Sequence, residues 1–333
     1  MNARVYVEKL QDAPESLREQ FDKALQVIGL AERARSLRSV FLKPNLTYPV
    51  YKKGVTTRVE FVRELVAALL RVNDTLKVVI GEGDGGYNSF SMSSALEAMG
   101  YTALGREFPQ VEIVNLSQLP TETVTLETHK GPYPIQLPMA FFDGIDVSIS
   151  CPLPKVHAMT RVTLSLKNIW GCLPDVMRLK NHYMLPHIIS RLARLLKFEY
   201  VFLDGKYGLN VNGPMDGEVL QVDWFVASNS LGAFDTTVTE MMGFKPDEIS
   251  HLNIARTYGL IPEKHEIEII GELSALKTQF RFRRDPWTYP ALLAFHSKHL
   301  TQFFYLSKFA GLLHDVMYLF RKRPIPPITT GEG

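Results

Sequence analysis

Apolar residues between positions 1 and 270 follow two spacings, one typical of buried strands and the other typical of amphipathic helices. Short apolar or alternating runs predict strands at Arg4–Lys9, Ser39–Leu42, Leu76–Ile80, Val111–Val114, Val147–Ser150, Tyr200–Leu203 and Val222–Ala227. Longer segments with apolar residues three and four apart predict helices at Pro14–Leu30, Val59–Val72, Ser91–Met99, Leu231–Met242 and Pro246–Tyr258. Two more runs, Thr123–Leu126 and Tyr133–Leu137, flank Lys130-Gly131 and predict a hairpin. Because strands and helices alternate, we predict an α/β fold with a largely parallel sheet flanked by helices.

Residues 274–333 differ in composition from the rest of the chain. The formal net charge is +2, yet residues 274–323 hold nine lysines and arginines against two acids, Asp285 and Asp315. That stretch is therefore +7, and it carries 11 of the 35 aromatic residues, while the remaining residues sum to −5. We predict one α/β domain over residues 1–273 and an aromatic- and basic-rich helical extension over residues 274–333.

The extension has a wide apolar face if it forms a helix from Leu300 onward. Lys308, His314 and Asp315 interrupt the apolar run, so the segment is too short to cross a bilayer. Two interpretations of residues 287–323 stay open. The segment packs on the domain or on a second subunit, or it lies at a membrane surface with Arg321-Lys322-Arg323 near anionic headgroups. Nucleic-acid binding is not expected, because the basic residues form no continuous stripe.

Composition otherwise describes an ordinary globular chain. The 22 glycines and 20 prolines are close to average usage, which excludes collagen-like and disordered classes. Two cysteines, Cys151 and Cys172, hold neither a disulfide scaffold nor an iron–sulfur cluster by themselves. A signal peptide has a continuous apolar core, and the first twenty residues of this chain contain none. We expect a cytoplasmic protein, with peripheral membrane contact as the alternative that the extension raises.

Polar and glycine-rich residues follow four of the predicted strands. They are Lys43-Pro-Asn45, Gly81–Gly86, the segment Cys151–His157, and Asp204-Gly205. Ligands of open α/β sheets bind outside the carboxyl ends of the strands. We therefore expect the functional site at this edge of the sheet.

The Gly81–Gly86 loop fits the spacing of a dinucleotide-binding fingerprint, but its charge argues against one. Glu82 and Asp84 would repel a pyrophosphate, and the next predicted helix begins several residues later. A turn that presents both carboxylates to a divalent metal or to ligand hydroxyls is favoured over a phosphate cradle. A plain solvated turn is the remaining alternative.

The segment Cys151–His187 is the densest in candidate chemistry. It carries lysines, arginines and histidines with one acid, Asp175, so a pocket that gathers them would suit a phosphate or carboxylate. A histidine and a desolvated lysine are suited to proton transfer. The candidate catalytic residues are Lys155, His157, Lys167 and Asp204. The candidate ligand-binding residues are Lys43, Asn45, Asn168, His182, Asn212 and Asp235, and Glu82 with Asp84 are the candidate metal ligands.

These blocks together resemble a family catalogued as domain of unknown function 362. The resemblance covers about residues 39–272 and rests on SVFLKPN at Ser39–Asn45, Gly81-Glu82, Pro154-Lys155-Val-His157, Thr163-Leu-Ser-Leu-Lys-Asn168, Asp204-Gly205, Asn212-Gly-Pro214, Phe234-Asp235 and Met242-Gly243. Some members look joined to ferredoxin-type cysteine motifs, which implies electron transfer. This chain departs there, because its two cysteines cannot hold such a cluster. The resemblance marks Lys43, Asn45, Glu82, Lys155, His157, Lys167, Asn168, Asp204 and Asp235 as patterned positions without assigning their roles.

Three functions follow as hypotheses. The leading one is an enzyme that acts on a small anionic molecule through lysine and histidine acid–base or electrostatic catalysis. The first alternative is a redox enzyme or accessory module with a separate electron donor. The second is a non-catalytic binding protein that docks through its C-terminal extension.

Overall fold

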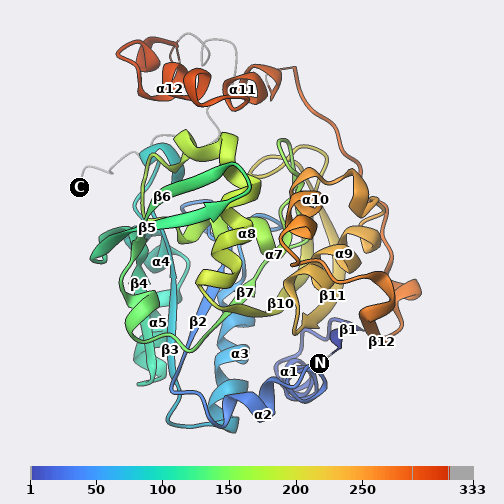
Figure 1. Cartoon of the computed structure of the whole chain (residues 1–333). Coiled ribbons are helices and arrows are strands. Elements are labelled where there is room, and N and C mark those ends of the chain that lie inside the picture. The colour runs from blue at the N-terminus through green and yellow to red at the C-terminus, as the bar shows by residue number, and fades with distance from the viewer. Residues whose placement is uncertain (1, 287, 314, 316–333) are drawn as a thin grey trace, which may run out of the picture.

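A single eight-stranded sheet forms the centre of the computed structural model, which describes residues 2–286, 288–313 and 315 (Figure 1). The strand order is β12-β1-β11-β10-β7-β2-β3-β4. Their bounds are β1 Ala3–Lys9, β2 Ser39–Pro44, β3 Lys77–Glu82, β4 Val111–Asn115, β7 Val147–Cys151, β10 Phe198–Asn210, β11 Glu218–Ser228 and β12 Ile267–Gly271. All pairs are parallel except those that β11 makes with β1 and β10. The predicted fold class, a largely parallel sheet flanked by helices, is confirmed.

Helices cover both faces of the sheet. They are α1 Pro14–Val27, α2 Leu30–Ala34, α3 Val59–Val72, α4 Met92–Ala98, α5 Tyr101–Glu107, α6 Ala140–Asp143, α7 Leu164–Asn168, α8 Leu185–Leu195, α9 Leu231–Met241 and α10 Ser250–Thr257. Shorter 3₁₀ turns include η1 Gly86–Asn88, η3 Ile169–Cys172 and η4 Arg178–Met184. A hairpin, β5 Thr121–Thr128 with β6 Gly131–Pro138, confirms the predicted pair, and β8 Val156–His157 with β9 Arg161–Val162 forms a second small one.

The alternation of side chains along β2 shows how the two hydrophobic cores divide. Val40 and Leu42 pack in the core under α1, α3, α4 and α5, whereas Phe41 between them packs in the core under α7, α8 and α9. Successive side chains of a strand point to opposite faces, so a strand covered on both faces is apolar throughout. This double burial is why the central strands are continuous apolar runs in the sequence.

Two short helices follow the domain at its C-terminal end. They are α11 Thr288–Ala294 and α12 Lys298–Leu306, and Figure 1 shows them at the top of the view, beyond the β5–β6 hairpin. The predicted helix from Leu300 is interrupted, because Ser307 after α12 has an extended backbone with ψ of 159°. The part of the predicted helical extension from residue 316 onward lies outside the described residues. Among the described residues, no helix is long and apolar enough to cross a membrane.

Candidate functional site

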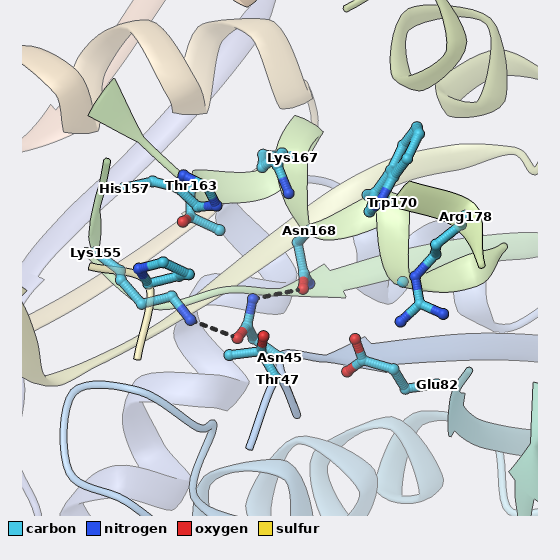
Figure 2. Close-up of a pocket in the computed structure, with 12 residues that line it drawn as sticks. Asn45, Thr47, Glu82, Lys155, His157, Thr163, Lys167, Asn168, Trp170 and Arg178 are labelled. Atoms are coloured by element: carbon cyan, nitrogen blue, oxygen red, sulfur yellow. Dashed lines mark hydrogen bonds between the residues drawn. The ribbon is translucent and has the colours of Figure 1, made fainter. Parts of the chain in front are cut away.

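The carboxyl ends of β2, β3 and β7 surround a small cavity (Figure 2). It encloses about 70 Å³, several times the roughly 10–15 Å³ that one water molecule needs. Its lining residues come from several separate segments: Asn45, Thr47, Glu82, Lys155, His157, Thr163, Lys167, Asn168, Trp170, Gly171, Arg178 and Pro214. The space therefore suits a ligand of a few heavy atoms surrounded by polar side chains.

Lys155 lies at one wall of the cavity and is fixed by two acceptors. Its Nζ donates to Asn45 Oδ1 at 2.8 Å and to the carbonyl oxygen of Val55 at 2.9 Å. Asn45 in turn donates through Nδ2 to Asn168 Oδ1 at 3.0 Å (Figure 2), and Asn168 donates to the Lys43 carbonyl at 2.9 Å. The chain of bonds joins the ends of β2 and α7, so three candidate residues from distant parts of the sequence form one rigid unit.

A buried ion pair lies beside the cavity, which one of its two residues, Glu82, also lines. Lys43 Nζ lies 3.0 Å from Glu82 Oε2, and the same carboxylate oxygen accepts from Leu46 N at 2.6 Å. Gly171 sits directly against this pair, since a Cβ there would lie 2.2 Å from Glu82 Oε1 and 2.9 Å from Lys43 Nζ. Only glycine permits this approach, and the pair balances its own charge.

Three further cations of the cavity have no carboxylate partner within the part of the chain that the structure describes. Lys155, Lys167 and Arg178 make no salt bridge there, and the bonds of Arg178 go to the carbonyl oxygens of Asp84, Leu173 and Asp175. Thr163 Oγ1, also buried in the lining, has no hydrogen-bond partner among the described residues. Buried charge without a partner is costly. The described lining of the cavity therefore has more basic than acidic side chains.

Burial lowers the pKa values of two lysines and one histidine of the cavity lining. It lowers the pKa of Lys155 to about 7, with Lys167 and Lys43 adding to the effect and Glu82 opposing it. It lowers the pKa of Lys167 to about 8, aided by the nearby Arg178 charge. The pKa of His157 falls well below its usual value, again through burial first and then through Lys167 and Lys155. An amine that titrates near pH 7 is suited to proton transfer.

The tautomer of His157 follows from its one hydrogen bond. Its Nδ1 accepts from the backbone N–H of Met159 at 3.1 Å, so the neutral ring carries its proton on Nε2. His157 is among the lining residues, and Nε2–H is the donor that its neutral ring has left. Lys155 and His157 thus form a base and a donor in one small space.

The helix α7, which carries Lys167 and Asn168, is held from below by Asp235 of α9. Asp235 accepts from Ser165 N at 2.8 Å, Ser165 Oγ at 2.6 Å and Leu166 N at 3.1 Å. Leu164, at the start of α7, is fully buried yet has a φ of +48°, a left-handed conformation that costs of the order of 1 kcal/mol for a residue with a Cβ. The surrounding packing imposes this shape, which is a feature of functional sites.

Six sequence-predicted residues are not part of the cavity lining: Lys43, Asp84, His182, Asp204, Asn212 and Asp235. Asp204 pairs at 2.8 Å with Arg58, which lines a separate groove. His182 is buried between Trp170 and Phe295, with Nδ1 3.1 Å from the Leu179 carbonyl oxygen. Asn212 donates to Asp285, and Asp235 holds α7. Asp204 lies inside β10, not after the end of a strand as predicted, and the side chains of Asp204, His182, Asn212 and Asp235 all contact other groups of the chain.

Glu82 and Asp84, the predicted metal ligands, already have partners within the protein. Asp84 Oδ1 accepts from Met92 N at 2.6 Å and from Asn115 Nδ2 at 2.8 Å, while Glu82 holds Lys43. Within the described residues, no group of three histidines, cysteines or acids has the arrangement of a metal site. These two carboxylates therefore serve protein donors in this structure.

Some lining residues were not assigned from the sequence. Thr47, Thr163, Trp170, Arg178 and Pro214 join the cavity through tertiary contacts. Arg178 had a signal, since it belongs to the basic segment Cys151–His187. Thr163 and Pro214 belong to blocks that carry the family resemblance, whereas Thr47 had no signal, because hydroxyls in loops are common.

Comparisons with known proteins agree with the sequence motifs. The profile of a family described as "Domain of unknown function (DUF362)" matches residues 40–240, more than half of the chain. A thylakoid-associated protein of Synechocystis, sll1697, is 28% identical over 129 residues. That match spans 37% of this chain and 40% of the relative, so less than half of the relative is represented.

Two solved structures are distantly similar. A lactate racemase apoprotein from Thermoanaerobacterium thermosaccharolyticum gives a TM-score of 0.47 at 11% identity, covering 72% of this chain and 57% of that one. A protein from Thermotoga maritima gives 0.39 at 11% identity, covering 75% and 61%. Likeness at this level says nothing about chemistry.

Proposed function

The chain belongs to the domain of unknown function 362 family, and from this premise we propose that its cavity is the active site of an enzyme acting on a small anionic molecule. One observation carries the proposal: three basic side chains that are buried or half-buried, Lys155, Lys167 and Arg178, line one cavity and form no salt bridge among the described residues, so that Lys167 and Arg178 hold positive charge there even when Lys155 is neutral. A carboxylate or phosphate would supply the missing charge.

Size narrows the substrate class. The 70 Å³ of space favours a short carboxylic acid or a phosphate of few atoms over a nucleotide. The substrate's anionic group lies between Lys167 and Arg178, because neither of these cations forms a salt bridge with a carboxylate among the described residues. The remainder of the substrate then faces Lys155 and His157.

In the proposed reaction Lys155 removes a proton from the substrate. A neutral Lys155 amine has two N–H bonds, which go to Asn45 Oδ1 and the Val55 carbonyl, so its lone pair is left for the cavity. His157 donates through Nε2–H to oxygen on which negative charge develops. The ammonium so formed exchanges its proton with solvent and returns one to the same carbon, so the cycle neither gains nor loses a proton.

We also propose a cytoplasmic location with peripheral contact to a membrane. Support comes from the name of the Synechocystis relative, thylakoid-associated, and from the absence of a membrane-crossing helix among the described residues.

The test uses the full chain with three probes: malonate, pyruvate and inorganic phosphate. We expect calorimetry to show binding of at least one probe, and the uncharged pyruvamide not to bind. Lys167→Met should weaken the binding about tenfold or more, since a charge-assisted bond to an anion is worth roughly 1.5–3 kcal/mol. Lys180→Met is the matched control, a half-exposed lysine of η4 outside the lining.

Proton transfer is read separately by NMR. Wild-type protein should speed exchange of the methyl protons of pyruvate in D₂O, and His157→Gln should slow this exchange while malonate still binds. Equal binding of pyruvate and pyruvamide, or equal losses in Lys167→Met and Lys180→Met, would contradict the proposal.

A further inference from the structure

Exposed large apolar side chains gather on the C-terminal helices. Eleven such residues occur among the described parts of the chain, and six of them lie between positions 289 and 312: Tyr289, Leu293, Phe303, Leu306, Phe309 and Leu312. We call these six the apolar face. Isolated exposed apolar residues are normal, but a concentration of this kind marks an interaction surface.

The residues of the apolar face lie together on the outer side of helices that are packed against the domain. Tyr289 and Leu293 are four apart on α11, and Phe303 and Leu306 are three apart on α12, so each pair shares one side of its helix. Other aromatic residues of the same segment contact the α/β domain. Phe295 stacks on His182 with ring centres 4.5 Å apart, and Tyr305 contacts Tyr87 at 5.8 Å.

Charge indicates the kind of partner. Residues 286–313 contain no aspartate or glutamate, and they carry the exposed lysines Lys298 and Lys308 together with His296 and His299. The sequence then continues to Arg321-Lys322-Arg323, outside the described residues. Asp285 and Asp315 lie just outside this range. An apolar surface whose own segment carries lysines and no acid is complementary to an anionic bilayer, where aromatic and aliphatic side chains enter the interface and lysines meet headgroups.

We propose that α11 and α12 dock the protein on an anionic lipid bilayer through the apolar face. The two helices lie in the interface and do not cross the bilayer, which agrees with their lengths of 7 and 9 residues. A second copy of the chain fits the apolar face less well, because matching faces would bring the Lys298 and Lys308 of both copies together.

Docking also fixes which part of the domain faces the membrane. The inner side of the extension rests on η4 and η1, and Arg178 of η4 lines the cavity. The bilayer therefore lies on the side of the molecule at which the carboxyl ends of β2 and β3 open. This orientation is independent of the proposed reaction.

The experiment measures sedimentation of the full chain with vesicles, without any substrate. Vesicles of phosphatidylcholine with phosphatidylglycerol should bind the protein, and those of phosphatidylcholine alone should bind it more weakly. The variant Phe303→Ser with Leu312→Ser should lose about tenfold or more of the affinity, since each burial of a large apolar side chain contributes a factor of this size. A matched control is Val219→Ser with Met139→Ser, because Val219 is 48% exposed and Phe303 is 47% exposed.

A second pair tests the charge. Lys298→Gln with Lys308→Gln should weaken binding to the anionic vesicles several-fold and reduce its salt dependence. Lys9→Gln with Lys77→Gln, two exposed lysines of the sheet, changes net charge equally and should bind as wild type. Circular dichroism confirms that all variants are folded.

Failure to bind anionic vesicles, or equal losses in test and control variants, would overturn the proposal. So would light scattering that shows a dimer dissociated by Phe303→Ser with Leu312→Ser in the absence of vesicle binding, because a second copy would then cover the face. Because no substrate is used, these outcomes do not depend on whether the cavity is an active site.

Discussion

Two clusters of charged residues at the same edge of the sheet differ in one respect, the balance of their charges. Beside Arg58, two acids are matched by two cations: Arg58 pairs with Asp204 and Asp12, and Lys206 also pairs with Asp12, while Lys53 of the same groove lies over the Tyr207 ring. Around Lys155, the cations outnumber the acids, and Glu82 is already held by Lys43. The groove beside Arg58 is the larger space, about 530 Å³ against 70 Å³. Charge left unpaired, rather than volume, distinguishes the candidate site.

The largest effect is expected from breaking the balanced cluster. Asp204→Ala leaves Arg58 buried with one acid fewer, and loss of one partner of a buried ion pair costs about 3–5 kcal/mol. Urea unfolding should show this decrease in the free energy of unfolding. Asp204→Asn should cost less, because its oxygen still accepts from Arg58 N. A loss below about 1 kcal/mol for Asp204→Ala would show that the pair is not structural.

A smaller effect is expected where the backbone approaches the Lys43–Glu82 pair. Gly171→Ala places a methyl group 2.2 Å from Glu82 Oε1, so the ion pair must move. We expect a loss of about 1–3 kcal/mol in the free energy of unfolding, the usual cost of overpacking. Gly144→Ala is the control, since nothing lies within 4 Å of a Cβ there. Equal losses for the two variants would contradict the predicted contact.

The unpaired cluster should show itself in the pH dependence of stability. Burial lowers the folded-state pKa of Lys155 to about 7 and that of Lys167 to about 8, from 10.5. Between pH 8 and 10 the unfolded chain therefore binds more protons, and the free energy of unfolding rises with pH by at most about 1.4 kcal/mol per pH unit for each lysine. Asp235, whose pKa burial raises to about 7, has largely titrated below this window. Thermal unfolding of Lys155→Met across pH 8–10 should show a flatter rise than wild type.

The smallest effect on stability is expected from removing an unpaired cation. Lys167→Met should change the free energy of unfolding by less than about 1 kcal/mol, or raise it, because a desolvated charge without a partner is lost. Lys206→Met, in the balanced cluster, should lower it by a comparable small amount because its pairing with Asp12 is lost. Calorimetric melting of both variants tests the difference in sign. A clear loss of stability in Lys167→Met would place Lys167 among the structural residues.

The sequence by itself determined the fold class and much of the element order. Strands buried on both faces must be apolar throughout, so SVFL, KVVI and VSIS identified β2, β3 and β7. The apolar spacing of Val59–Val72 marked α3 at the residues where it begins and ends. The helix α8, Leu185–Leu195, was not predicted, although its apolar residues Leu185, Ile188, Ile189 and Leu192 have helical spacing. The strand β12 was not predicted either, because charged residues lie next to its short apolar run.

Part of the site was also readable, because parallel strands deliver their carboxyl ends to one edge. Lys155, His157, Lys167, Asn45 and Asn168 follow strands or lie in the basic segment, and the structure gathers them in one cavity. Only the tertiary structure decided which neighbours are engaged. Asp204 meets Arg58 and Asp235 meets α7 through contacts between residues 146 and 70 positions apart, respectively. Pairing of charges depends on distances across the fold, and residue type and spacing along a chain do not contain those distances.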